Sequence, residues 1–326
     1  MSVVLPLHNA QEFLDSALAQ LQALDSTVQY QFVVIDDHST DSTFETIQGW
    51  DVHLGDHMVV ERAVRRGVAE ARNQALLHCT GEFVWFVDAD DHWDGAIVRD
   101  MLAAAGTADL VVSNARKIAL DSTSRGEIVD AERSEVISGA EAFTRLLEGT
   151  LQGHLWNKLF RRTALPPGIF PTTRAHSDLG ALLEVLPSFG AVSLVPVSHY
   201  TYVLRSGSIL NSPDYKWQDL GACFATAQRV AESIPGPRVE RALLRFKYRN
   251  LVVPFANELS RRRDSISEED LRSLRRQNKS RARLSDTLRV GLLSPLAVQV
   301  AMIRIFPSLY ELLYRRNRSD RWTPIT

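Results

Sequence analysis

The first third of the chain alternates two patterns of apolar residues. Short apolar runs, typical of strands buried on both faces, occur in residues 2–7, 31–37, 56–63 and 81–87. Between these runs, apolar residues recur at the spacing of an α-helix in residues 10–24, 43–50 and 65–79. Strands that alternate with helices predict an α/β fold, with a mostly parallel, Rossmann-like sheet flanked by helices.

The rest of the chain has a less regular middle and a helical end. We predict a strand in residues 108–118, a helix in 138–149 and a pair of strands within 190–205. From about Lys216 onward the pattern is helical. The sequence therefore predicts an α/β region followed by a C-terminal helical region.

Three of the predicted strands end in polar residues. His8 and Asn9 follow the first strand, Asp36 and Asp37 end the second, and the run "DADD" (88–91) follows the fourth. In open parallel sheets, ligands bind at the carboxyl ends of the strands. Crowded carboxylates repel one another and are costly to desolvate, so we expect a cation to bind beside them.

Asp88 and Asp90 are the predicted metal ligands. Residues two apart in a strand point to the same face, so both carboxylates can reach one divalent ion. Hard oxygen ligands with open positions for phosphate suit Mg²⁺ or Mn²⁺. The alternative is a solvated acidic turn that caps the next helix.

Asp36 and Asp37 can accept hydrogen bonds from ribose hydroxyls or from a base N–H. The alternative is a purely structural turn that caps the following helix. A dinucleotide-binding Rossmann motif is not expected, because no G-x-G-x-x-G follows the first strand, and the sequence has no Walker-type phosphate loop.

The composition is ordinary for a soluble globular protein, with 326 residues, 45% hydrophobic and 23% charged. Cys79 and Cys223 form no closely spaced pair, so we expect buried thiols in a reducing cytoplasm. The opening residues lack the features of a signal peptide. No run reaches the roughly 18–20 uncharged apolar residues that span a membrane. We therefore expect a cytoplasmic protein.

A net charge of −2 conceals a basic C-terminal segment. Residues 261–326 contain 15 Lys and Arg against 7 Asp and Glu, and the preceding residues 22 against 32. Within the segment, residues 292–313 are apolar, broken by Pro295 and Pro307, and flanked by arginines. We expect residues 281–318 to bind an anionic membrane surface peripherally. The alternatives are docking on the catalytic domain and pairing of two subunits into a homo-oligomer.

Four blocks of the sequence together resemble family 2 inverting glycosyltransferases. They are "VVLPLHNAQEFLDSALAQL", "FVVIDDHSTDSTFETI", "RGVAEARNQAL" and "GEFVWFVDADD", in the order and spacing of the family across residues 2–115. Three later segments, "WNKLFRR", "HSDLGALLEVL" and "YTYVLRSGSIL", are similar to a bacterial branch that builds surface glycans, and this likeness ends near residue 215.

This resemblance implies the A-type glycosyltransferase fold. Residues 1–115 would form the nucleotide-sugar-binding half of the catalytic domain and residues 116–215 its acceptor-binding half. Residues 216–326 would form the helical region with its basic, apolar tail.

The resemblance also implies roles for single residues. The donor-binding positions are Pro6, His8, Asn9, Asp36, Asp37, Arg72 and Asp88. Asp88 and Asp90 match the D-x-D metal motif, with Asp90 as the direct ligand of Mn²⁺ or Mg²⁺. Asp178 matches the Asp of a Glu-Asp catalytic pair, while Ser177 replaces the Glu. His8 replaces a Tyr, which weakens the case for stacking on the base.

Inverting transfer explains why such residues are needed. An acceptor hydroxyl attacks the anomeric carbon, a carboxylate takes the hydroxyl proton, and cations neutralise the departing diphosphate. Lys158 and Arg205 are candidates for diphosphate or acceptor contacts, with solvated surface cations as the alternative. Trp93 and Trp156 are candidate sugar platforms, with core packing as the alternative.

The expected function is metal-dependent inverting transfer of a sugar from a UDP-sugar to a lipid-linked or polymeric glycan at the inner face of a bacterial membrane. No nucleic acid partner is expected. A second hypothesis is a catalytically silent protein that binds a glycan or partner; Ser177 favours it and the intact D-x-D pair opposes it. A third is a nucleotidyltransferase, opposed by "PLHNAQEF" where a Gly-rich phosphate loop would stand.

Overall fold

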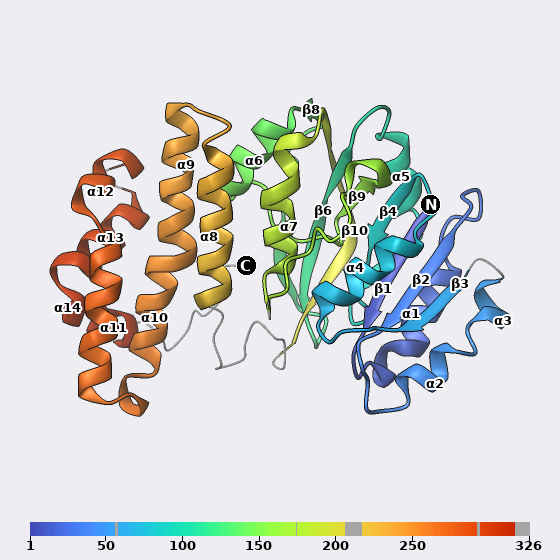
Figure 1. Cartoon of the computed structure of the whole chain (residues 1–326), viewed down its shortest axis with the longest axis horizontal. Coiled ribbons are helices and arrows are strands. Elements are labelled where there is room, and N and C mark those ends of the chain that lie inside the picture. Colours follow the sequence, from blue (N-terminus) through green and yellow to red (C-terminus); the bar gives the residue numbers. More distant parts are fainter. Residues whose placement is uncertain (56–57, 174, 206–216, 292–293, 317–326) are drawn as a thin grey trace. The chain divides into compact units, whose positions relative to one another are not determined.

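The computed structural model describes residues 1–55, 58–173, 175–205, 217–291 and 294–316 (Figure 1). The chain forms two compact units. The first comprises Met1–Leu146 and Thr150–Tyr215, and the second Leu147–Gly149 and Lys216–Thr326.

The first unit contains a mixed sheet with the strand order β3-β2-β1-β4-β9-β6-β10-β5, to which β7 adds beside β6 and β8 beside β10. The strands are β1 (Ser2–Leu7), β2 (Gln31–Asp36), β3 (Met58–Arg62), β4 (Phe83–Phe86), β5 (His92–Trp93), β6 (Leu110–Ala119), β7 (Ser124–Ile128), β8 (Glu135–Ile137), β9 (Lys158–Arg161) and β10 (Val192–Leu204).

Most of the central strands run in one direction. β3, β2, β1 and β4 pair in parallel. β9 pairs antiparallel with both β4 and β6, and β6 pairs in parallel with β10. β6 and β10 therefore have the same direction as the first four strands. The predicted α/β fold with a mostly parallel sheet is confirmed.

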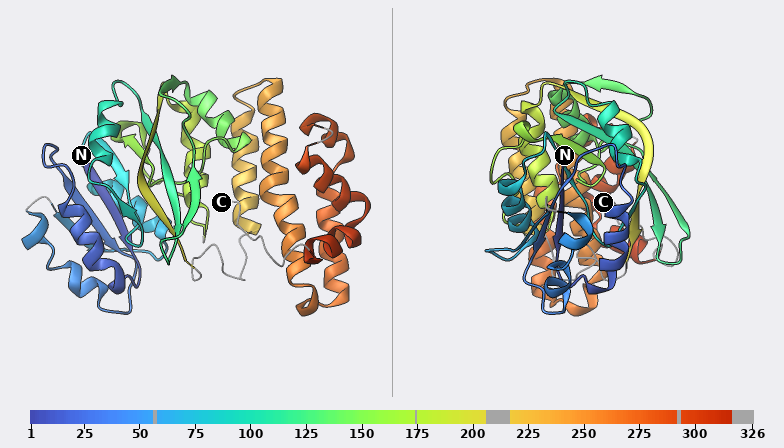
Figure 2. Two further views of the ribbon diagram at one scale, coloured as in Figure 1. Left: turned by 180° about the vertical axis from the view of Figure 1, so that it is seen from behind. Right: turned by 90° about the vertical axis from the view of Figure 1, so that its right-hand side faces the viewer.

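Helices lie on both sides of this sheet, with α1 and α4 on opposite sides (Figure 2). β1, β2 and β4 are buried on both faces, as the continuous apolar runs predicted. β3 lies at the edge of the sheet and is only partly buried, so the prediction is wrong for this strand. The α-helices of the first unit are α1 (Leu14–Gln22), α2 (Thr43–Ile47), α3 (Asp51–Leu54), α4 (Val68–His78), α5 (Ile97–Ala103), α6 (Gly139–Glu148, which ends in the second unit) and α7 (Ser177–Val185).

The pair of strands predicted within residues 190–205 is one strand, β10. Its pairing with β6 changes register between Val195 and Tyr200. Pro196 lies in that interval and lacks a backbone N–H, so it cannot donate to a neighbouring strand. The chain therefore makes a β-bulge and continues, where the sequence pattern suggested a turn.

The second unit is helical, as predicted for the end of the chain. Its α-helices are α8 (Trp217–Ala231), α9 (Pro237–Lys247), α10 (Val253–Arg261), α11 (Glu268–Arg281), α12 (Leu284–Val290), α13 (Pro295–Ile305) and α14 (Pro307–Arg316). Its core includes Tyr248, Val252, Val300, Ile303 and Tyr310. None of the helices in the described ranges has the length and apolarity needed to cross a membrane.

Candidate active site

The carboxyl ends of β1 and β2 form the first part of the site. Pro6 lies in β1 opposite Ile35 of β2. His8 Nδ1 lies 2.7 Å from the carbonyl oxygen of Asp37. Asn9 has a left-handed backbone (φ 48°), and its side-chain oxygen accepts a hydrogen bond from Thr40 N at 2.8 Å. The loop after β1 is thereby fixed to the loop after β2.

Asp36 and Asp37 differ sharply in their surroundings. Asp36 is fully buried, pairs with Arg62 at 3.0 Å and accepts a hydrogen bond from Ser39 N. Asp37 is half-buried, and its Oδ1 accepts a hydrogen bond from Gly67 N at 2.7 Å. The structural interpretation therefore suits Asp36, whereas Asp37 still has carboxylate surface for a ligand.

The carboxyl end of β4 brings two acidic side chains together with two arginines. Asp88 lies 3.4 Å from the guanidinium of Arg72, which is only 8% exposed. Asp90 lies 3.3 Å from Arg205, whose guanidinium also stacks over the ring of Phe13 at 4.2 Å. Arg205 is therefore partly buried beside the D-x-D motif, and the alternative of a solvated surface cation is wrong.

Asp178 approaches this cluster from a distant part of the sequence. It lies in the first turn of α7, where the helix dipole stabilises a negative charge. Desolvation raises the pKa of Asp88 to about 6; Arg72 opposes the shift, while Asp90 and Asp178 add to it. Asp88 therefore experiences the negative charge of both Asp90 and Asp178, and a cation or a proton beside Asp88 is stabilising.

The third carboxylate of "DADD", Asp91, has a structural role that sequence reasoning did not predict. It is 1% exposed and accepts hydrogen bonds from the Tyr200 hydroxyl and from Val203 N, both at 2.9 Å. The Tyr200 hydroxyl in turn accepts from Asp88 N at 3.4 Å. Asp91 and Tyr200 thus anchor the D-x-D turn to β10. The only sequence signal was a third carboxylate beside the motif.

Trp93 and Trp156 are core residues, so their expected role as sugar platforms is not supported. They are 7% and 4% exposed. Trp156 stacks on Tyr200 with ring centroids 4.5 Å apart, and Trp93 stacks on the same tyrosine at 6.2 Å. Two apolar rings that enclose a tyrosine contribute packing energy and fix its hydroxyl direction.

Lys158 is likewise not a surface cation, and its burial does not support the expected contact with a diphosphate or an acceptor. Its side chain is fully buried, and its Nζ donates to Asn157 Oδ1 at 2.9 Å and lies 3.6 Å from Asp130 Oδ2. Burial lowers the pKa of Lys158, and Asp130 and Asp178 oppose this shift. The ammonium is therefore held inside the protein, close enough to Asp178 to act on it electrostatically.

His154 lies beside the proposed base, although the sequence gave it no role. Its ring stacks on Trp156 with centroids 4.7 Å apart. Its buried Nε2 has no hydrogen-bond partner within the described part of the chain. Burial lowers the pKa of His154 to about 4, while the nearby charge of Asp178 opposes this shift. The imidazole is therefore neutral at pH 7.

The described residues offer a partial metal site. Among them, no three His, Cys, Asp or Glu side chains lie close enough to hold an ion by themselves. Asp88 and Asp90 nevertheless provide two carboxylates on one turn, partly exposed at 36% and 43% of their side-chain surface. This donor set fits a Mg²⁺ or Mn²⁺ ion that takes its remaining oxygens from water and a bound diphosphate.

The sequence is similar to those of known glycosyltransferases. The model of Glycosyl transferase family 2 matches residues 2–166. The chain is 25% identical over 171 residues to the putative glycosyltransferase EpsH of Bacillus subtilis, covering 51% of this chain and 48% of EpsH. It is 31% identical over 103 residues to TarS of Staphylococcus aureus, a poly(ribitol-phosphate) beta-N-acetylglucosaminyltransferase, covering 31% of this chain and 18% of TarS. The chain thus spans about half or less of the length of these two relatives.

Two solved structures share the fold. S. aureus TarS 1–349 in complex with UDP-GlcNAc superposes with a TM-score of 0.68 at 19% identity, covering 99% of this chain and 93% of that one. The mannosyltransferase PcManGT from Pyrobaculum calidifontis, in complex with GDP-Man and Mn²⁺, has a TM-score of 0.54 at 18% identity, covering 97% and 85%. The predicted A-type architecture is thereby confirmed.

Proposed function

The chain belongs to family 2 of the glycosyltransferases, and from this premise we propose that it transfers a sugar from a nucleotide-diphosphate donor, preferably a UDP-sugar, with inversion. The observation that carries the proposal is the convergence of Asp88, Asp90 and Asp178 beside Arg72 at the carboxyl edge of the sheet. Structures of the same fold contain UDP-GlcNAc or GDP-Man with Mn²⁺.

The donor nucleotide would lie over the loops after β1 and β2. The exposed carboxylate surface of Asp37 suits a hydrogen bond from a base N–H or a ribose O–H. His8 and Asn9 flank this carboxylate. Arg72 would contact the diphosphate through its terminal guanidinium nitrogens, since Nη2 lies 3.4 Å from Asp88 at the metal motif.

Asp90 and Asp88 would hold Mn²⁺ or Mg²⁺. Bound there, the ion would supply charge neutralisation for the departing diphosphate. Arg205 lies against Asp90 and would add positive charge on the same side. The ion would complete the charge compensation that Arg72 and Arg205 provide only in part.

Asp178 would act as the general base. In the reaction, the acceptor oxygen bonds to the anomeric carbon, the bond from that carbon to the diphosphate oxygen breaks, and the hydroxyl proton moves to Asp178. Asp178 occupies the first turn of α7 and lies close enough to the Lys158 ammonium to interact with it electrostatically.

The acceptor would be a lipid-linked or polymeric surface glycan at the inner face of a bacterial membrane. Support comes from the relatives, since TarS is a poly(ribitol-phosphate) beta-N-acetylglucosaminyltransferase.

Release of nucleoside diphosphate from a panel of nucleotide sugars, with and without Mn²⁺, tests this function. We expect Mn²⁺-dependent release with one donor class, abolished by Asp90→Ala. Asp94→Ala is the matched control, because Asp94 is an exposed carboxylate four residues further on whose side chain caps a turn at Ala96 N.

A catalytically silent glycan-binding protein is the rival, favoured by Ser177 in the place of the family Glu. Ser177 is buried and contributes no charge. A donor that binds, as detected by calorimetry, without any release over hours at high enzyme concentration would establish the silent function instead.

A further inference from the structure

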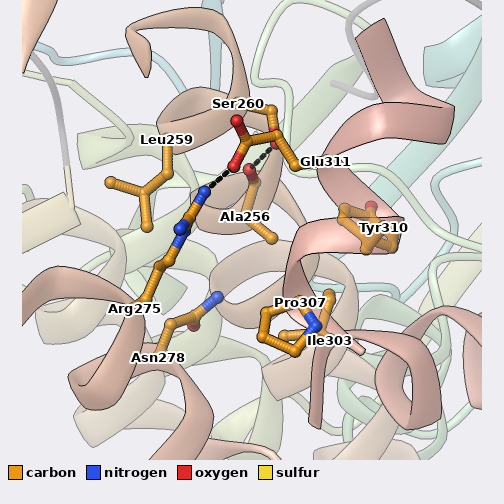
Figure 3. Close-up of a pocket in the computed structure, with 9 residues that line it drawn as sticks. All are labelled: Ala256, Leu259, Ser260, Arg275, Asn278, Ile303, Pro307, Tyr310 and Glu311. Atoms are coloured by element: carbon orange, nitrogen blue, oxygen red, sulfur yellow. Dashed lines mark hydrogen bonds and ion pairs between the residues drawn. The ribbon is translucent and has the colours of Figure 1, made fainter. Parts of the chain in front are cut away.

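Helix α14 turns a mixed face toward the core of the second unit. Pro307, Tyr310 and Glu311 line a small pocket together with residues of α10, α11 and α13 (Figure 3). Tyr310 is 7% exposed, and its hydroxyl donates to Asn257 Oδ1 at 2.7 Å. Glu311 pairs with Arg275 and Arg263. The inner side of α14 therefore packs against other helices of the second unit.

The outer side of the same helix is apolar and exposed. Leu309, Leu312 and Leu313 are 46%, 62% and 40% exposed, and Phe306, just before the helix, is 57% exposed. Positions 309, 312 and 313 fall on one face of α14, and Phe306 immediately precedes the helix. We call these four residues the α14 outer stripe. Single exposed apolar residues are ordinary, but a continuous stripe indicates an interaction surface.

The charge around the stripe is positive. Arg315 and Arg316 are exposed in the last turn of α14, and Arg315 pairs with Asp264 at 2.8 Å. Glu311 is the only acidic residue between positions 305 and 316, and it is paired on the inner side. The whole segment 261–326 has eight more basic than acidic residues. A partner for this surface must therefore accept both apolar side chains and positive charge.

We propose that the α14 outer stripe docks the protein on an anionic lipid bilayer. The apolar side chains would enter the boundary between headgroups and acyl chains, while Arg316 remains among anionic headgroups. Arg315 would exchange its ion pair with Asp264 for a headgroup. This inference rests on the proposed function in one respect: a lipid-linked acceptor would be located at the membrane, where the enzyme must meet it.

A second copy of the chain fits this surface less well. A stable protein interface buries roughly 1,200–2,000 Å², far more than four side chains on one helix supply. Two copies paired through this stripe would also bring like-charged arginines together, which costs free energy.

The structure narrows the surface predicted from sequence, residues 281–318. Ala297, Val300, Ile303 and Tyr310 are buried in the second unit. Packing within the second unit therefore accounts for the inner side of the apolar segment. Only its outer side is exposed and able to contact a membrane.

Co-sedimentation of the full chain with vesicles tests the proposal. Neutral phosphatidylcholine vesicles are compared with vesicles containing about a third phosphatidylglycerol, at low and high salt. We expect binding to the anionic vesicles that weakens at high salt. Leu309→Gln with Leu312→Gln should reduce vesicle affinity at least tenfold, and Arg316→Glu should reduce it further. Gln is chosen because it favours helix as Leu does.

Val52→Gln is the matched control, since Val52 is an apolar residue 84% exposed in the first unit. Circular dichroism and release of nucleoside diphosphate from soluble donor should be native in every variant, which separates this test from that of the proposed function. Failure of the wild-type protein to bind anionic vesicles, or equal binding by the double variant, would overturn the proposal. So would a wild-type dimer in light scattering that the double variant turns into a monomer.

Discussion

At the scale of single residues, the site is a set of charges that neutralise one another incompletely. Arg72 and Arg205 each face one carboxylate of the D-x-D motif. Asp178 adds a third carboxylate from another element. The surplus of negative charge is what a divalent ion and a transferable proton would balance.

Asp178→Asn removes the proposed base but preserves the shape of the side chain. We expect the transfer rate to fall about 10²- to 10⁴-fold with donor affinity unchanged, measured by single-turnover kinetics and titration calorimetry. Glu184→Gln, an exposed position on the same helix, should be neutral. A donor affinity that falls in parallel with the rate would place Asp178 in the donor site.

Tyr200→Phe tests the anchor beneath the metal motif. The variant leaves Asp91 without one donor and Asp88 N without its acceptor, so we expect a stability loss of about 1–3 kcal/mol. The affinity for Mn²⁺ in the presence of donor should fall as well, because the turn is no longer held. In the control Tyr30→Phe, the lost hydroxyl has no partner among the described residues, and metal affinity should not change. If metal affinity in Tyr200→Phe equals that of the wild type, the tyrosine is structural only.

His154 predicts a pH dependence of stability. Its pKa is lowered to about 4 in the folded protein from an ordinary value of 6.5. Between these values the unfolded chain binds more protons, so stability falls as pH decreases from about 6.5 towards 4. Urea unfolding at pH 7 and pH 5 should show a drop that is about 1–2 kcal/mol smaller in His154→Phe than in the wild type. An equal drop in both proteins would contradict the assignment of this pH dependence to His154. His92→Phe, at an exposed position, is the control for replacing an imidazole ring with a phenyl ring.

At the scale of elements, β9 joins the two parallel parts of the sheet. It lies antiparallel between β4 and β6 and brings Lys158 into the interior. Asp130 balances that charge and also accepts hydrogen bonds from Asn157 Nδ2 and Gln152 N, both at 2.8 Å. The segment before β8 is thereby tied to the start of β9.

Asp130→Ala should destabilise the first unit by about 3–5 kcal/mol, because it leaves a buried ammonium without a counter-charge. Chemical denaturation measures this effect, and Glu132→Ala, at an exposed position two residues further on, is the control. The double variant Asp130→Ala, Lys158→Met should recover part of the loss. No recovery would mean that the hydrogen bonds of Asp130, and not the ion pair, determine its contribution.

At the scale of the whole molecule, the proposed chemistry lies in one of the two units. All of the predicted catalytic, donor and metal residues fall within Met1–Leu146 and Thr150–Tyr215. The second unit contains the α14 outer stripe. Donor chemistry and surface attachment are therefore separable in experiments on the full chain.

Donor with Mn²⁺ should stabilise the first unit selectively. A ligand at 100 times its Kd adds about 2.7 kcal/mol, so hydrogen exchange should slow across the sheet and not in α11 to α14. Asp90→Ala should abolish this protection. Equal protection in both units would show that the donor also acts on the helical unit.

The sequence by itself determined the order of β1 to β4 with the helices between them, and the carboxylates that end these strands. It did not predict the strands β5, β7, β8 and β9. Hydrophobic periodicity is a local property, and the carboxyl ends of parallel strands share one edge, so Asp37, Asp88 and Asp90 were predictable together. The helical character of the last third followed from the same periodicity.

Only the tertiary structure decided which polar groups the interior would hold. Asp91 and Tyr200 are 109 positions apart in the sequence and meet through one hydrogen bond. The burial of Lys158 depends on a partner carboxylate that no sequence pattern assigns to it. The burial of Trp93 and Trp156 depends on a tyrosine from β10. Such contacts depend on the packing of distant segments, because a buried charge or hydroxyl is stable only where the fold supplies its partner.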